Sequence, residues 1–377
     1  MKKSSKIFTS TLLGLVLVSS SVYAATDSNK PSTLPDKGVI KQMKHYNKIK
    51  DLTESNQSAA LTKYIRGLSE KELFETAEEM IKGNADFERE GMILVPAIKE
   101  KWKNGPSKEA YKLIRDKGFT PKFREHVLDA MFSNQMVEKS LEDGNIINEV
   151  TSLVNDPSED EMVRVYALKK LRAGDKVDHA KLKLEKLVFD ANEPTKIRGA
   201  AIVAMHRTKD PSFEKTMDKI LKDKAVDNET LLQYAIVETA KANISNKYMK
   251  EVKELSKQKN SKELNNTISY AMAITGGKEA IKFATTVYDE NNKEISAYTF
   301  RTRMYDVMDL LNSSDSEDVE AGIKASIYGQ IANALPKLKE LKQSSTDVQV
   351  QKLAAEALAT IDPAAMVDES VLAKVGK

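Results

Sequence analysis

Four histidines are the first residues in this sequence to examine for metal or acid–base chemistry: His45, His126, His179 and His206. No two of them are four residues apart, and the H-E-x-x-H spacing that places two imidazoles around zinc on one helix face does not occur. The chain also has no cysteine, which excludes thiolate ligands, thiol nucleophiles and disulfides. We therefore expect the histidines to be satisfied surface or interface residues, and we expect neither a metal nor another cofactor.

Catalytic motifs are missing as well. There is no G-x-S-x-G, and Gly276-Gly277 lacks the following Lys and Ser or Thr of a phosphate loop. Two of the 56 acidic residues could still converge as a glycosidase pair, so a helical-toroid enzyme is one alternative. Aromatic residues make up only 6% of the chain, with Trp102 the single tryptophan, which is sparse for a groove that stacks sugars. The sequence predicts no enzyme.

Three tyrosines precede an alanine at equivalent places in a repeated pattern: Tyr166, Tyr234 and Tyr270. In a stack of similar units, equivalent positions line up along one flank. Such a stripe of phenols suits contact with a protein or peptide partner. The alternative is that each ring packs between neighbouring units, because aromatic residues at helical spacing are usually part of the core.

Four arginines share a position three residues before an apolar packing residue, at spacings of 35, 40 and 34 residues: Arg89, Arg124, Arg164 and Arg198. They could form a cationic row for an acidic ligand, with Arg164 and Arg198 as its best candidates. Alternatively, each arginine pairs with an acid that recurs in the turns, and the candidates for this role are Asp156, Asp190 and Glu193.

These residues sit in a helical pattern that returns every thirty-odd residues. The segments 163–167, 197–201 and 231–235 lie 34 residues apart, and 267–271 follows after 36. A period of this size is typical of stacked helical pairs, none of which can bury its apolar face alone. Abundant Ala, Leu, Lys and Glu with few Gly and Pro favour helix throughout. The chain is expected to be all-α.

Helix starts can be placed from capping signals. Ser69 with Glu72 and Ser158 with Glu161 have the spacing of a capping box, in which each side chain satisfies an amide of the first turn. The other boundaries come from turn residues and apolar periodicity. They predict one helix over 181–189, one over 295–311 and a longer one over 319–341.

The stretch 182–205 resembles the HEAT family of helical repeats. A leucine-rich first helix with Leu182, Leu184 and Leu187 leads into the turn 190–194, and a second helix carries Ile197-Arg198, Ala201 and Ala204. The resemblance covers residues 69–361, and it departs from the pattern where Leu232, Ile268 and Gln351 replace the arginine. It implies an α-solenoid of about seven to eight antiparallel helix pairs with the second helices on the concave side. It also implies close helix approach at the alanines and neighbouring repeats ordered by the turn Asp, and no chemistry.

The first 24 residues read as an export signal. A basic start with Lys2, Lys3 and Lys6 precedes the apolar core 12–18, and small residues lead to cleavage near Ala24. An uncleaved anchor is the alternative. Removing the three lysines from a chain of 59 basic and 56 acidic residues leaves 56 of each, so no cationic surplus supports nucleic-acid binding.

The expected organisation is therefore a signal peptide (1–24), a flexible lead-in (25–38), an N-terminal helical cap (39–67), a HEAT-like solenoid (68–362) and a tail (363–377). We expect a secreted or envelope-exterior, bacterial-looking, non-enzymatic scaffold, monomeric and without a membrane span, that binds a protein or peptide. The second alternative to this is binding to an anionic cell envelope through lysine-rich helix faces, such as the one formed by Lys247, Lys250, Lys253 and Lys257.

Overall fold

The computed structural model describes residues 43–82, 93–102, 106–132, 145–172, 177–226, 228–258, 260–288 and 293–362. Every regular element within these ranges is a helix, which confirms the all-α prediction. The predicted signal peptide, the lead-in, the first residues of the cap, the tail and Arg89 lie outside the described residues. No helix within the described ranges has both the length and the apolar character that crossing a membrane requires.

The described helices fall into three groups along the chain. The first group consists of α2 (Lys44–Glu54), α3 (Ser58–Gly67), α4 (Glu70–Lys82), α5 (Leu94–Lys101), α6 (Ala110–Arg115), α7 (Pro121–Met131), α9 (Asn145–Asn155) and α10 (Glu161–Lys170). The middle group consists of α11 (His179–Leu182), α12 (Leu184–Phe189), α13 (Thr195–Arg207), α14 (Phe213–Leu221), α15 (Glu229–Lys241), the 3₁₀ helix η3 (Ser245–Tyr248), α16 (Met249–Ser256), α17 (Lys262–Thr275) and α18 (Lys278–Val287). The last group consists of α19 (Lys293–Thr302), α20 (Met304–Leu311), α21 (Ser316–Gly329), the 3₁₀ helix η5 (Ala332–Ala334), α22 (Leu335–Ser344) and α23 (Val348–Ile361).

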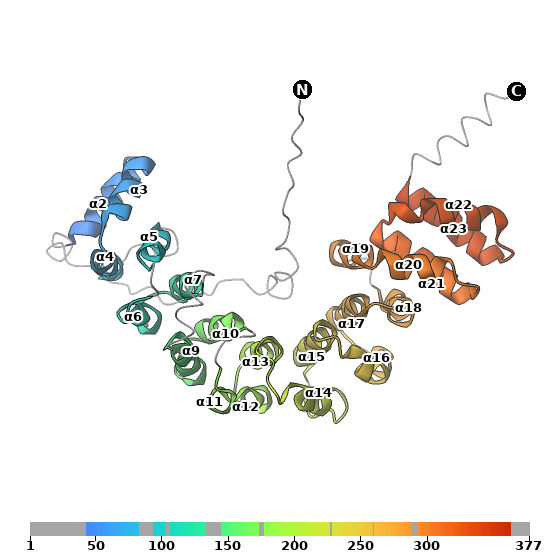
Figure 1. Cartoon of the computed structure of the whole chain (residues 1–377), viewed down its shortest axis with the longest axis horizontal. Helices are drawn as coiled ribbons and strands as arrows, with labels where there is room; N and C mark the ends of the chain where they lie inside the picture. Colours follow the sequence, from blue (N-terminus) through green and yellow to red (C-terminus); the bar gives the residue numbers. More distant parts are fainter. Residues whose placement is uncertain are drawn as a thin grey trace, which may run out of the picture.

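These helices trace an arc (Figure 1). Helices α7, α10, α13, α15, α17 and α19 lie on its inner side, and α6, α9, α12, α14, α16 and α18 lie on its outer side. Each of the inner helices from α10 to α17 contacts the outer helix that precedes it and the inner helix on either side. Contacts therefore run mostly between neighbours in the sequence, which explains how a long chain builds one continuous apolar core without a sheet.

The inner helices approach one another through alanines. Four equivalent alanines, one on each of α10, α13, α15 and α17, have no exposed surface: Ala167, Ala201, Ala235 and Ala271. A methyl side chain allows two helix backbones to lie close together, so a larger residue at these places would force neighbouring helices apart. The recurring alanine found in the sequence is thus a packing position.

One of the two predicted capping boxes is confirmed. The Ser69 amide donates to the Glu72 carboxylate at 2.8 Å, and the Glu72 amide donates to the Ser69 hydroxyl at 3.3 Å.

The predicted box at Ser158 and Glu161 is wrong. Ser158 donates its amide and its hydroxyl to Asp156, and the side chain of Asp160 caps α10 by accepting from the amides of Met162 and Val163. Because the Ser158 hydroxyl is bonded to Asp156 in this turn, it does not cap the helix, which begins two residues later than the box requires.

Three predicted helices are broken in the structure. Lys183 has a left-handed backbone (φ +54°) and separates α11 from α12, and Arg303 separates α19 from α20. The helix predicted over 319–341 ends at Gly329, where Gln330 is also left-handed (φ +49°). The amide of Ile331 then reaches the Ser326 carbonyl at 3.0 Å, a helix-ending bond of the Schellman type.

Candidate functional site

Three arginines on consecutive inner helices make the same backbone contact. The Nε of Arg124, Arg164 and Arg198 donates to the carbonyl ten residues earlier, at 2.8, 2.9 and 2.9 Å respectively. Those carbonyls belong to the C-terminal ends of α6, α9 and α12, where helices have acceptors without a partner of their own. Each arginine therefore fastens an inner helix to the end of the outer helix before it.

Two of these guanidinium groups also form bidentate ion pairs across to the next helix pair. Arg124 donates to the two carboxylate oxygens of Glu159 at 2.9 and 2.6 Å, and Arg164 donates to Glu193 at 2.8 Å twice. Arg124 is 1% exposed and Arg164 is 3% exposed. Parallel N–H···O bonds of this kind fix geometry as well as charge, so each pair sets the position of one helix pair against the next.

The pKa of Glu159 reflects its pairing with Arg124. Burial acts to raise the pKa of Glu159, but the hydrogen bonds from Arg124 and from the Asp160 amide outweigh it, so the pKa is lowered. Because Arg164 is buried and paired with Glu193, it does not present a cationic surface. Arg198 is half-buried and held by the Val188 carbonyl. The geometry favours internal pairing of the arginines over a row that receives an acidic ligand.

Of the predicted tyrosines, Tyr234 packs most closely between helices. A Cβ atom added at Gly199 on α13 would lie 2.2 Å from a ring carbon of Tyr234 on α15. The ring therefore rests on the glycine backbone of the neighbouring inner helix, in space that any side chain at 199 would occupy. Burial raises the pKa of the Tyr234 phenol, and the charge of Glu238 raises it further.

A buried carboxylate lies beside this ring. Glu238, 2% exposed, accepts a bond from the His206 imidazole at 2.6 Å and one from the Lys241 ammonium at 2.7 Å. Burial acts to raise the pKa of Glu238, and the bonds to His206 and Lys241 bring it below its ordinary value. His206 is on α13 and Glu238 on α15, so this contact joins two inner helices.

Tyr270 on α17 continues the same line of residues. Its pKa is raised by burial, then by the charge of Glu238 and by Tyr298. Tyr298 belongs to α19, the next inner helix, and 68% of its surface is exposed. Tyr234, Glu238, Tyr270 and Tyr298 together span α15, α17 and α19, and we refer to them as the inner tyrosine patch.

Tyr166 does not join this patch. It is half-buried on α10, which is separated from α15 by α13. The Lys169 ammonium lies 6.0 Å from its ring centre. Tyr305 on α20 is the most exposed large apolar side chain among the described residues, at 81%. The structure thus brings two of the three predicted tyrosines together and adds Tyr298, which has no alanine after its repeat position to reveal it in the sequence.

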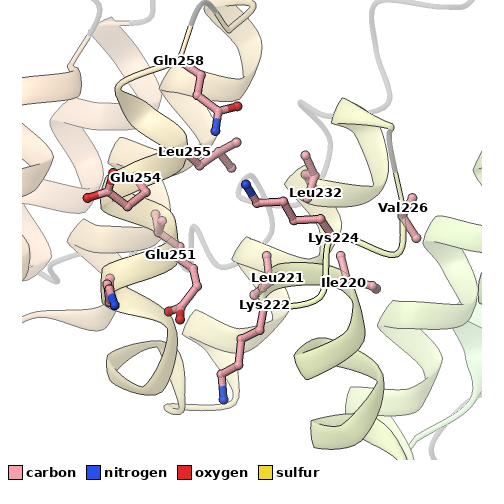
Figure 2. A pocket seen from close by; sticks show the side chains of 12 residues that line it. Ile220, Leu221, Lys222, Lys224, Val226, Leu232, Glu251, Glu254, Leu255 and Gln258 are labelled. Atoms are coloured by element: carbon pink, nitrogen blue, oxygen red, sulfur yellow. The ribbon is translucent and has the colours of Figure 1, made fainter.

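A separate feature lies on the outer side of the arc. A cavity of about 410 Å³ opens between α14 and α16. Its floor is aliphatic, and its rim carries charged residues from both walls (Figure 2). The residues that line it are Ile220, Leu221, Lys222, Lys224, Val226, Leu232, Lys250, Glu251, Val252, Glu254, Leu255 and Gln258. None of them is aromatic, so the cavity offers no face on which a sugar ring could stack.

The lysine-rich faces are largely neutralised by neighbouring acids. Lys247 contacts Glu214 at 2.9 Å and Asp218 at 3.7 Å, and Lys257 contacts Glu254 at 2.8 Å. In the described ranges, no three His, Cys, Asp or Glu side chains gather in a way that could hold a metal ion. Two histidines lie against acids, His206 against Glu238 and His179 against Asp210 at 3.1 Å, and the His45 ring lies 2.9 Å from the Tyr64 hydroxyl.

Glu159, the acid partner of Arg124, was not among the predicted partners, although the chain carries a signal for it. Glu159 and Glu193 each stand five residues before the next arginine of the row, in the segments 159–164 and 193–198. The recurrence of an acid at this spacing indicates a position facing the preceding arginine. Glu193 was among the expected partners, and Glu159 was not.

No protein-family model matches the chain, and no curated protein matches it significantly.

Proposed function

We propose that the chain is a HEAT-like α-solenoid that is exported and works as a non-enzymatic, monomeric scaffold for a protein or peptide partner. The repeated contact of each inner helix with its outer helix and its two inner neighbours supports the solenoid. The arginine bonds that recur at equivalent positions of α7, α10 and α13 support repeats of one kind. Export rests on the N-terminal sequence alone.

The observation that carries the binding function is the inner tyrosine patch. Two half-buried phenols and one that is 68% exposed lie on successive inner helices around a buried carboxylate. Tyrosine offers a large amphipathic contact area with little side-chain entropy to lose, and it is enriched among residues that dominate binding energy. Two half-buried tyrosines followed by an exposed one, all on inner helices, are suited to a partner that lies along the inner side of the arc.

The two alternatives have less support. A toroid enzyme needs a site with paired carboxylates and surfaces for a sugar, and the cavity between α14 and α16 has aliphatic walls. An envelope binder needs unpaired lysines on one face, and Lys247 and Lys257 are paired with acids. Neither alternative has an observation of its own comparable to the tyrosine patch.

Partner capture from culture medium by the purified mature protein tests the proposal. We expect Tyr298→Ala to weaken retention of the captured partner by about tenfold or more, as truncation of a central tyrosine does. Tyr305→Ala, at another exposed tyrosine, is the matched control and should retain the partner. Retention of no protein, combined with binding to isolated cell wall, would exclude the scaffold.

The three tyrosines at equivalent positions of the repeated pattern give a second test. Replacing Tyr166, Tyr234 and Tyr270 by Phe removes the hydroxyls and keeps the ring volume. If the phenols contact the partner, capture weakens while the melting temperature stays nearly unchanged. A large loss of stability with unchanged capture would assign these rings to packing alone.

A further inference from the structure

The cavity between α14 and α16 lies where the arginine row is interrupted. Leu232 occupies on α15 the position that Arg164 occupies on α10 and Arg198 on α13. At those places the arginine reaches the end of the preceding outer helix, and the Arg164 guanidinium goes on to an acid of the next turn. Leucine has neither the length nor the donors to do this. Leu232 lines the cavity that remains, whose volume is about 410 Å³.

The cavity has an aliphatic floor. It is formed by six side chains: Ile220 and Leu221 from α14, Val226 from the connection after it, Leu232 from α15, and Val252 and Leu255 from α16. A cavity of this size is within the range of about 300–1,000 Å³ that small-ligand sites show, and most such sites are apolar with a few placed polar groups. An apolar group of a ligand would be favoured here by removal from water.

Two opposite charges on the rim have no partner within the described ranges. One carboxylate oxygen of Glu251, on α16, is enclosed and makes no hydrogen bond to the described part of the chain. Lys224, in the connection after α14, is exposed and makes no ion pair or hydrogen bond among the described residues. Figure 2 shows its ammonium extended across the opening toward α16, at a different height from the Glu251 carboxylate. Because Glu251 also lines the cavity, a cation bound there would supply a charge partner that its carboxylate lacks.

We propose that this cavity binds a short peptide with apolar side chains and free ends. Its ammonium pairs with Glu251. Its apolar side chains lie on the floor formed around Leu232, and its carboxylate pairs with Lys224.

Other ligand classes match the walls less well. An aliphatic anion would pair with Lys224 and cover the floor, but it would leave Glu251 unpaired beside apolar atoms. A sugar or a nucleoside would find no aromatic face among the lining residues. The cavity opens between the outer helices α14 and α16, whereas the inner tyrosine patch belongs to the inner helices α15, α17 and α19 (Figure 1). The proposal therefore does not depend on the scaffold function proposed above.

Calorimetric titration of the mature protein with leucyl-leucine tests the proposal. Two blocked forms of the same dipeptide, N-acetylated and C-amidated, remove one end charge each. We expect N-acetylation, which removes the charge that pairs with Glu251, to lower the affinity about tenfold. C-amidation removes the charge that pairs with the exposed Lys224, and it should lower the affinity less. Free leucine should bind more weakly than leucyl-leucine, because it covers less of the floor. Equal affinity for free leucine would overturn the peptide assignment.

Protein variants assign the two ends. Glu251→Gln should abolish the difference between leucyl-leucine and its N-acetyl form, and Lys224→Met should abolish the difference between leucyl-leucine and its amide. Glu263→Gln on α17 and Lys215→Met on α14 remove exposed charges that do not line the cavity, and they should bind like the parent. Hexanoate binding that equals leucyl-leucine binding and is indifferent to Glu251→Gln would identify an aliphatic-anion site instead.

Leu232→Arg is the decisive variant. It restores the arginine of the row and puts a longer, charged side chain into the cavity. Binding of leucyl-leucine should be lost while the circular-dichroism spectrum and the melting temperature are kept or improved. A folded Leu232→Arg protein that binds the dipeptide with unchanged affinity would overturn the proposal, as would absence of binding by the parent protein at millimolar dipeptide.

Discussion

The helices from α6 to α13 and those from α15 to α19 solve one packing problem with different chemistry. In the first region a buried arginine joins three elements, as Arg124 does with the Ile114 carbonyl and Glu159. In the second region the equivalent positions are Leu232 and Ile268. Ile268 is fully buried among apolar residues, and Leu232 borders a cavity. The junction between successive helix pairs can therefore be filled by an ion pair, filled by an apolar side chain, or left open.

The difference shows what the arginine adds. An apolar residue stabilises through burial and has no preferred direction, whereas a bidentate ion pair requires one geometry. The first region is thus expected to be fixed in the angle between helix pairs. The second region has freedom to hold a cavity on its outer side and exposed tyrosine on its inner side.

The largest effect is expected from Arg124→Ala. The substitution leaves the Glu159 carboxylate buried without its partner, which typically costs about 3–5 kcal/mol. Urea unfolding followed by circular dichroism measures the loss. Arg66→Ala breaks the exposed pair with Glu100 and should cost no more than about 1 kcal/mol. Equal costs for the two variants would show that the buried pair has no special role.

Ile268→Ala is the corresponding change in the second region. Removing a fully buried isoleucine side chain is expected to cost about 2–4 kcal/mol through lost burial and the cavity left behind. Since no charge is involved, the cost should be the same at pH 7 and pH 4, unlike that of Arg124→Ala. A strongly pH-dependent cost would contradict apolar packing at this position.

Acid should weaken both regions through one carboxylate each. The pKa of Glu159 and that of Glu238 lie below their ordinary value of 4.5 in the folded protein. Groups with a lowered pKa contribute stability that is complete above the unfolded value and is lost as the pH falls through the folded value. The unfolding free energy should therefore fall as the pH drops below about 4.5. Its acid slope should be shallower in Glu159→Gln and in Glu238→Gln. Identical slopes in parent and variants would place the acid sensitivity elsewhere.

The smallest effect is expected when the ion pair is converted into the chemistry of the second region. Arg124→Met combined with Glu159→Leu removes both charges at once, and such replacements are often neutral or stabilising. We expect a change within about 1 kcal/mol of the parent, against the large loss from Arg124→Ala alone. A double variant as unstable as the single one would show that the backbone bond to Ile114, and not the ion pair, holds the junction.

Local signals in the sequence predicted a large part of this structure. The all-α class, the alanines at the packing positions and the Ser69–Glu72 capping box follow from residues close together in the chain. The failures occurred where two local interactions competed or where a break needed no special residue. Asp160 caps α10 in place of Ser158 because Asp156 engages the serine, and Lys183 and Gln330 adopt left-handed backbone without being glycine.

What the sequence determined by itself is the all-α class and the place of many of the helices, because helix formation and capping depend on neighbours within a few residues. The tertiary structure alone decided which acid meets which arginine, that Tyr234 rests on Gly199 and that a cavity remains beside Leu232. These contacts join residues about 30 or more positions apart across different helices, or depend on the space left between them. Their geometry follows from how closely the backbones pack, which residue types along the chain do not specify.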